Sequence, residues 1–181
     1  MTRPAISKIV LTGIVLATFS SASLAIDSVS AEVASGNKSE IYRVGAQWNM
    51  DGSLARSATS EIWGYWDLTG AVWRENKYQN EEGATQNFID IGVTPTGRWQ
   101  QLNHLGAYFE AGLGPHLNSK VYDNNHRALS THLQFGTALG VGYVMPSGLD
   151  LGLKITHFSN GGIKHPNNGV NLAILKVGYK F

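Results

Sequence analysis

A histidine and a serine stand two residues apart near the C-terminus, at His157 and Ser159, directly after a run in which apolar residues alternate with other types. Such alternation is typical of a β-strand, in which residues i and i+2 share a face. The imidazole and the hydroxyl are therefore expected side by side, with backbone positions roughly 7 Å apart. Serine becomes an effective nucleophile when a neighbouring base takes its proton, and imidazole can be that base near neutral pH. The pair therefore indicates a hydrolase that works by nucleophilic catalysis.

Asn171 is the expected third member of this site. It follows the loop 160–169 and shares the parity of Ala173 and Leu175 in the next apolar run. A catalytic histidine is usually held in one tautomer by an acceptor on its other ring nitrogen, and an amide oxygen can serve. His157, Ser159 and Asn171 all continue the apolar faces of their strands, where polar groups are costly unless they serve a purpose. This placement favours a substrate that comes from lipid.

The loop after Ser159 carries groups that could stabilise an oxyanion. The Gly161-Gly162 pair would let backbone N–H groups approach a developing negative charge, and the amides of Asn160 and Asn167 are candidate additional donors. A His-x-Ser pair in a strand also occurs without any function, and the other histidines lack this context. Of these, His116 and His126 are interpreted as polar loop residues.

The N-terminus has the pattern of a secretory signal peptide. Arg3 and Lys8 form a short positive region before the apolar stretch Ile9–Phe19, which is too short to span a bilayer. Ser23-Leu24-Ala25 then offers a small-x-small cleavage site. Val29-Ser30-Ala31 is a second, weaker site. Residues 1–25 are therefore predicted to be the signal peptide and residues 26–181 a single mature domain.

Composition narrows the class of protein further. The chain has no cysteine, which excludes disulfides and thiolate metal sites, and a net charge of +1 with mixed signs gives no indication of nucleic-acid binding. The 21 glycines and 7 tyrosines accompany short alternating runs separated by turn residues, a pattern typical of a transmembrane β-barrel. A soluble β-sandwich would give similar alternation.

Eight strands are predicted, which fits an all-β, 8-stranded antiparallel outer-membrane β-barrel with a narrow, side-chain-filled interior. Asp51-Gly52 is expected to be the turn after the second strand. Arg43, Asp90, Glu110 and Lys154 are expected to face inward as a polar network. The strands are predicted at about 27–36, 40–49, 59–75, 87–95, 105–113, 132–145, 149–158 and 170–181. The tryptophans are assigned to interfacial girdles or the barrel wall: Trp48, Trp63, Trp66, Trp73 and Trp99.

The run from His157 to Gly169, which reads HFSNGGIKHPNNG, resembles the signature of the lipid A 3-O-deacylase (PagL) family. The segments Gly64–Asp67 and Phe109–Gly114, the overall length and a final strand that ends in Phe181 are similar to the family as well. The resemblance covers the whole mature chain. It implies an 8-stranded barrel in the outer membrane of a Gram-negative bacterium that hydrolyses the ester at position 3 of lipid A, in lipopolysaccharide.

Carried over by position, the resemblance implies that His157 is the base and Ser159 the nucleophile, and it ties Asn160, Gly162 and Asn167 to the oxyanion hole or its support. It implies no cofactor and no metal. The family commonly has a glutamate twelve residues after the serine, where this chain has Asn171. We therefore expect reduced dependence on that residue without loss of activity.

Two alternatives remain open from the sequence. Outer-membrane phospholipase A also pairs His-x-Ser with an asparagine twelve residues on, but in a larger, calcium-dependent dimer. Residues 26–181 are too few for its twelve strands at about 10 residues each plus turns. The other alternative is a structural or adhesive barrel without activity. A homodimer is compatible with the sequence.

Overall fold

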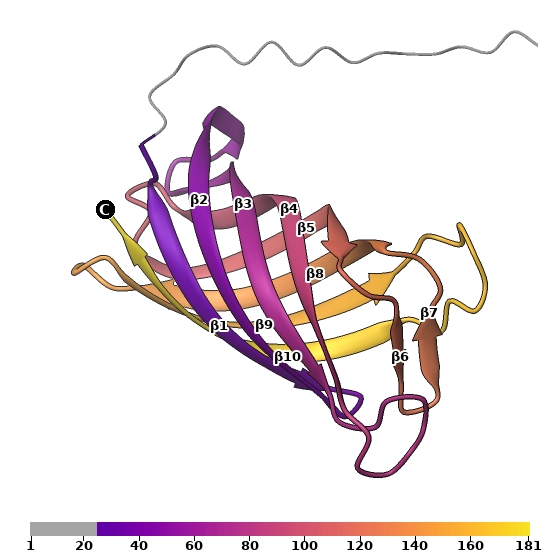
Figure 1. The fold of residues 1–181 in the computed structure, drawn as a ribbon. Helices are drawn as coiled ribbons and strands as arrows, with labels where there is room; N and C mark the ends of the chain where they lie inside the picture. The colour runs from indigo at the N-terminus through magenta and orange to yellow at the C-terminus, as the bar shows by residue number, and fades with distance from the viewer. Residues whose placement is uncertain (1–24) are drawn as a thin grey trace, which may run out of the picture.

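The computed structural model describes residues 25–181, which form a closed antiparallel barrel of eight strands with a small two-stranded hairpin at one end (Figure 1). The predicted fold class is thereby confirmed. The barrel closes where β1 pairs with β10. The predicted signal peptide, except for Ala25, lies outside the described residues. Among residues 25–181 no helix has the length and apolar character needed to cross a membrane.

The strands of the barrel are, in order around the wall, β1 (Ser28–Gly36), β10 (Val170–Lys180), β9 (Leu149–Ser159), β8 (Leu133–Val144), β5 (Gly106–Asn118), β4 (Gln86–Gln101), β3 (Ser60–Glu75) and β2 (Ser39–Arg56). The hairpin consists of β6 (Tyr122–Asn124) and β7 (Arg127–Leu129).

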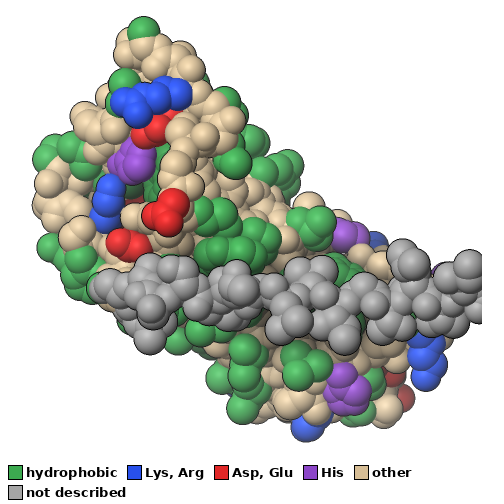
Figure 2. All heavy atoms as spheres, turned by 90° about the horizontal axis from the view of Figure 1, so that it is seen from above, with side chains coloured by type: hydrophobic (Ala, Val, Ile, Leu, Met, Phe, Trp, Pro, Cys, Tyr) green, Lys and Arg blue, Asp and Glu red, His purple; other side chains and the backbone are tan. Residues whose placement is uncertain are grey.

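Alternation along each strand separates an apolar outer wall from a polar interior. In β9, for example, Leu151, Leu153 and Ile155 are exposed, whereas Asp150 and Lys154 are buried. Figure 2 shows hydrophobic side chains spread over the outer wall, with charged and histidine side chains gathered toward the ends of the molecule. This is the distribution expected when the outer wall faces lipid.

The two ends of the barrel differ in the length of their connections. Turns of three or four residues join the strands at the end that holds both termini. At the other end lie the tight turn 37–38 and three longer segments, 76–85, 119–132 and 160–169. Outer-membrane barrels have short periplasmic turns and longer extracellular loops, so the loop-bearing end is extracellular.

The end of the second strand differs from its prediction. β2 does not stop at Asp51-Gly52 but continues to Arg56, where the true hairpin turn follows. Gly52 has a φ of +82°, and the register with β3 shifts between Asn49 and Ser53. The Asp-Gly pair therefore forms a β-bulge, which needs the same left-handed glycine as a turn and so gives the same sequence signal.

β4 and β5 are longer than predicted, since β4 continues past Pro95 to Gln101 and β5 continues past Leu113 to Asn118. The β4–β5 pairing is interrupted between Gly92 and Thr96, so the missing N–H of the proline costs no ladder bond there. As a result His116 is a residue of β5 instead of a loop residue. Its buried Nδ1 lies 3.1 Å from the Asp90 carboxylate inside the barrel.

Ion pairs fill the barrel interior and include Arg43, Glu110 and Lys154, three of the four residues predicted to face inward. The fourth, Asp90, is also buried there, beside His116. Arg98 lies at the centre of this network and donates to Glu110 at 2.7 Å and, more distantly, to Asp150 at 3.4 Å. A second group joins Glu32 to Arg43 and to Lys154. Buried charges are tolerated only when they are paired in this way, so the network is what allows a polar lumen to be packed.

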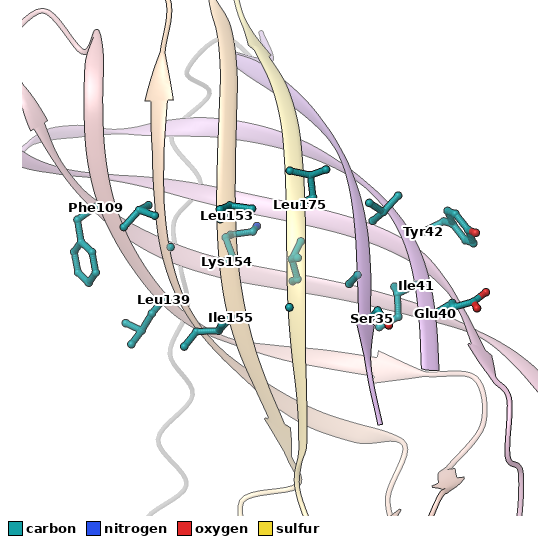
Figure 3. Close-up of a pocket in the computed structure, with 16 residues that line it drawn as sticks. Ser35, Glu40, Ile41, Tyr42, Phe109, Leu139, Leu153, Lys154, Ile155 and Leu175 are labelled. Carbon is teal, nitrogen blue, oxygen red and sulfur yellow. The ribbon is translucent and has the colours of Figure 1, made fainter. Parts of the chain in front are cut away.

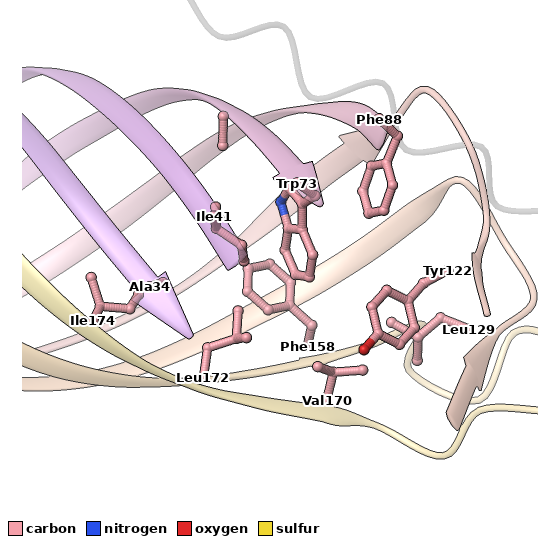
Figure 4. Close-up of a cluster of buried hydrophobic side chains, with 11 residues drawn as sticks. Ala34, Ile41, Trp73, Phe88, Tyr122, Leu129, Phe158, Val170, Leu172 and Ile174 are labelled. Carbon is pink, nitrogen blue, oxygen red and sulfur yellow. The ribbon is translucent and has the colours of Figure 1, made fainter. Parts of the chain in front are cut away.

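The extracellular end of the lumen is closed by a hydrophobic cluster (Figure 4). Trp73 stacks on Phe88 and meets Phe158 and Tyr122 edge-on, and Leu129 completes the contact with the hairpin. Burial raises the pKa of the Tyr122 hydroxyl above its ordinary value, so the group is neutral at physiological pH. Trp73 is thus an interior residue, as is Trp63, and neither belongs to a girdle.

Candidate active site

The register of three neighbouring strands places His157 between two polar side chains on the outer wall. His157 of β9 is paired with Asn171 of β10 on one side and with Thr137 of β8 on the other. Its Nδ1 lies 2.7 Å from Oδ1 of Asn171, within hydrogen-bond distance. An amide oxygen can only accept, so this bond requires the proton on Nδ1 and leaves Nε2 as the basic nitrogen.

Ser159 lies one position further toward the extracellular rim on the same face of β9. It is half-buried and is paired across the sheet with Phe135. Within residues 25–181 its hydroxyl makes no hydrogen bond, so the group is free to meet a substrate. Catalytic hydrogen bonds are often long or unformed before substrate is bound, and the adjacency of Ser159 and His157 is what the strand itself fixes.

The loop 160–169 is organised by two buried or half-buried amide side chains. Asn160 is fully buried; its Oδ1 accepts from the N–H of Gly162 at 3.0 Å and its Nδ2 donates to the carbonyl of Lys164. Oδ1 of Asn167 in turn accepts from the backbone N–H of Asn160 at 2.9 Å. The three residues tied by resemblance to oxyanion stabilisation therefore form one hydrogen-bonded unit directly after Ser159.

Two glycines at the start of the loop expose backbone next to the serine. Gly161 and Gly162 both have positive φ values, 64° and 80°, which residues with a β-carbon rarely adopt. Among the described residues the N–H of Gly161 has no acceptor. The loop thus offers a free backbone donor, the N–H of Gly161, close to the nucleophile, as an oxyanion site requires.

Gly169 is a site residue that sequence reasoning did not single out. A β-carbon built on it would lie 2.5 Å from Cε1 and 3.0 Å from Nε2 of His157. The backbone of Gly169 therefore packs directly against the imidazole. Its place at the end of an asparagine-rich loop, one residue before a strand, was the available signal, but only the fold shows which ring it touches.

The wall below the site is grooved. Leu139, Ile155 and Ala173 line a depression of about 470 Å³ that begins at His157 and Asn171. The same three residues border a larger depression of about 790 Å³, which continues along the outer wall to Tyr42 (Figure 3). Both are lined largely by aliphatic side chains, so a chain of methylene groups could lie there with its ester at Ser159.

The arrangement supplies a nucleophile, a base whose tautomer is fixed, and backbone donors on a lipid-facing rim. That set of groups is what an esterase needs for acyl transfer. All six residues predicted for the site lie at this rim: His157, Ser159, Asn160, Gly162, Asn167 and Asn171. Across residues 25–181 no group of three or more His, Asp or Glu side chains is arranged to hold a metal ion.

Comparison with known proteins identifies a family and relatives of this chain. A family model described as lipid A 3-O-deacylase (PagL) matches residues 40–180. The lipid A deacylase PagL of Pseudomonas aeruginosa is 31% identical over 162 residues, covering 86% of this chain and 89% of that protein. The lipid A deacylase PagL of Bordetella bronchiseptica is 29% identical over 119 residues, covering 66% and 65%.

Solved structures support the fold. The crystal structure of the outer membrane enzyme PagL superposes with a TM-score of 0.73 at 24% identity, over 85% of this chain and 99% of that one. The Yersinia pestis outer membrane protein Ail has a TM-score of 0.50 at 12% identity, over 85% and 97% of the two chains.

Proposed function

The chain belongs to the lipid A 3-O-deacylase (PagL) family, and we propose on that basis how its residues act. It is an outer-membrane enzyme that hydrolyses the ester at position 3 of lipid A and releases a 3-hydroxy fatty acid. Ser159 is the nucleophile, His157 the base and Asn171 the group that orients the base. The observation that carries this assignment is the 2.7 Å contact between His157 and Asn171 on the lipid-facing wall, one strand position from Ser159.

The chemistry follows from that geometry. Nε2 of His157 takes the proton of the Ser159 hydroxyl as its oxygen attacks the ester carbonyl carbon. The tetrahedral intermediate collapses when the imidazolium returns the proton to the departing sugar oxygen, which leaves an acyl-serine. A water molecule, activated by the same nitrogen, then attacks the acyl-serine and frees the fatty acid and the serine.

The loop stabilises the negative charge that forms on the carbonyl oxygen. Gly161 presents a backbone N–H without an acceptor among the described residues beside Ser159, while the N–H of Gly162 is held by Oδ1 of Asn160. Preorganised donors contribute most when they are fixed before reaction. Asn160 and Asn167 supply that fixity through their hydrogen bonds within the loop. The role of Asn160 is support, since its donor, Nδ2, is already used by the carbonyl of Lys164. Asn167 supports it in turn by accepting from the backbone N–H of Asn160.

The position of the site matches the substrate. The rim that holds Ser159 is the extracellular one, and lipid A resides in the outer leaflet on that side. The apolar groove below His157 would hold an acyl chain along the wall. No substrate has to enter the barrel, whose interior is filled by the ion-pair network.

Processing of the N-terminus is also constrained. Cleavage after Ala25 would leave β1 intact, whereas cleavage after Ala31 would remove its first half and the pairing of Ser28 and Val29 with β10. We therefore propose Ala25 as the last residue of the signal peptide. A homodimer stays a prediction.

The test is mass spectrometry of lipids after incubation with the refolded protein in detergent. Wild type is expected to yield a lipid A lighter by one 3-hydroxyacyl group, and Ser159→Ala is expected to yield none while it folds normally. Ser147→Ala, at the opposite end of the same strand pair, serves as the matched control. Activity retained in Ser159→Ala would disprove the assignment, and lysophospholipid from a parallel phospholipid incubation would make the enzyme a phospholipase.

A further inference from the structure

The catalytic loop is held along its far side by the β6–β7 hairpin. The backbone N–H of Asn168 donates to the carbonyl of Ala128 at 3.1 Å, and Oδ1 of Asn168 accepts from the N–H of Ala128 at 3.0 Å. Ser130 donates from its hydroxyl to the carbonyl of Pro166 at 2.9 Å. The loop that carries the proposed oxyanion donors is therefore docked on another loop as well as anchored by its own strands.

Arg127 makes the contact nearest to the reacting groups. Its Nη1 donates to the carbonyl of Asn168 at 2.7 Å and to the carbonyl of Gly169 at 3.0 Å. Gly169 is the residue whose backbone packs against the imidazole of His157. One guanidinium nitrogen thus holds the backbone segment that packs against the imidazole of the catalytic base.

The hairpin that carries Arg127 is itself rigidly attached to the barrel. Asn124 is fully buried; its Nδ2 donates to the carbonyl of Asn37 at 2.7 Å, and its Oδ1 accepts from the N–H of Lys77 at 2.8 Å. Tyr122 and Leu129 lie in the hydrophobic cluster. Arg127 therefore links the active-site loop to the closed end of the barrel, to which the hairpin is attached.

We propose that Arg127 is a positioning residue that holds Gly169 against His157, so that Nε2 is kept aimed at Ser159. The need is greater here because Asn171 is a neutral partner, whose bond to the imidazole is weaker than that of a carboxylate. This inference rests on the proposed function of Ser159 and His157. An exposed arginine at this rim would otherwise be assigned to binding of the lipid A phosphates, and the two roles differ in what they change.

The experiment compares Arg127→Met, which keeps the aliphatic stem, with Arg127→Lys, which restores donors that can reach both carbonyls. Arg127→Met is expected to lower kcat about tenfold, the scale of a small misplacement of catalytic groups, with KM within about twofold of wild type. Arg127→Lys is expected to recover most of that loss. Arg74→Met is the control, because Arg74 is an exposed arginine at the same rim whose side chain, among residues 25–181, hydrogen-bonds only Asn76.

A second measurement tests the reactivity of Ser159 without lipid A. The rate at which diisopropyl fluorophosphate modifies Ser159 reports the serine–histidine pair alone, and titration with the same reagent counts folded active protein. The rate is expected to fall in Arg127→Met by the same factor as kcat. A raised KM with an unchanged modification rate would instead make Arg127 a phosphate ligand and overturn the inference. Activity in Ser159→Ala would refute the proposed function separately.

Discussion

Asn171 stands at the position where the resemblance to the family implies a glutamate. Its oxygen lies 2.7 Å from Nδ1 of His157, so it fixes the tautomer as well as a carboxylate would. It carries no charge, however, and therefore stabilises the imidazolium that forms during attack less than an anion does. Fixing the tautomer of His157 and stabilising its imidazolium by a negative charge are separate contributions to catalysis. Asn171 supplies only the first.

Asn171→Asp separates these contributions because the two side chains have the same shape. We expect kcat to rise severalfold, since an anion beside the ring stabilises the imidazolium that forms during attack. Asn171→Ala is expected to lower kcat, because the side chain that holds the proton on Nδ1 of His157 is removed. Steady-state kinetics measure both variants. An unchanged kcat in Asn171→Ala would contradict the orientation role, and an unchanged kcat in Asn171→Asp would show that charge at this position does not contribute.

Gly169 shows how a backbone position can be part of an active site. Its φ of +67° and its contact with the imidazole both exclude a side chain. Gly83 has a similar φ of +80° in another extracellular loop, but a β-carbon there would meet nothing within 4 Å. The two glycines therefore differ in contact and share the same conformational strain.

Gly169→Ala is expected to lower kcat by about a hundredfold, because the added methyl displaces the catalytic ring. Gly83→Ala carries the same strain without the clash and is expected to keep wild-type kcat. The shift of the folded band in unheated gel electrophoresis would verify that both barrels form. Equal losses in the two variants would show that strain, and not the imidazole contact, limits activity.

At the scale of elements, the β6–β7 hairpin has two faces with different tasks. One face buries Tyr122 and Leu129 against Trp73 and closes the lumen. The other face pairs with the catalytic loop, where Leu129 forms a bridge with Asn167. Packing of the hairpin and order in the active site are consequently coupled.

Leu129→Ala is expected to cost about 2–5 kcal/mol of packing, the usual range for a buried leucine. Because the loss falls on the hairpin, trypsin should cut faster at Lys120 and Arg127, and kcat should fall with it. Leu54→Ala, at an exposed leucine near the periplasmic turn, is the matched control. Faster cleavage without any change in kcat would show that the hairpin and the site are independent.

At the scale of the whole molecule, the charged lumen and the apolar wall reverse the arrangement of a soluble protein. Stability then depends on pairing inside the barrel. Glu110 accepts from Arg98 twice, at 2.7 and 3.0 Å, and from the hydroxyl of Tyr65 at 2.8 Å. Among the described residues, removing its charge leaves the guanidinium with Asp150, at 3.4 Å, as its remaining ion-pair partner.

Glu110→Gln is therefore expected to lower the free energy of unfolding by about 3 kcal/mol, as for other broken buried pairs. Unfolding by guanidinium chloride in detergent micelles, followed by tryptophan fluorescence, measures the change in the free energy of unfolding. Glu82→Gln breaks the exposed ion pair with Lys77 and should leave the unfolding midpoint where it is. A midpoint for Glu110→Gln equal to that of wild type would mean that the network does not stabilise the barrel.

The sequence by itself determined the features that depend on local periodicity. The parity of His157 and Ser159, the outward face of Asn171, the inward charges and the eight-stranded wall all follow from the rule that neighbouring side chains in a strand point to opposite faces. The family signature identified the same residues. The residues at which strands end were predicted less accurately, because the Asp51-Gly52 bulge and Pro95 give the same sequence signals as turns.

Only the tertiary structure decided which distant groups meet. The contact of Gly169 with the imidazole, the hold of Arg127 on the loop and the burial of His116 beside Asp90 each join segments by strand register or loop docking. No local pattern encodes such contacts, since they depend on how the barrel closes and on the two short strands in a loop that lacks apolar alternation. The nucleophile and its base are thus a property of one strand, and their alignment is a property of the closed barrel.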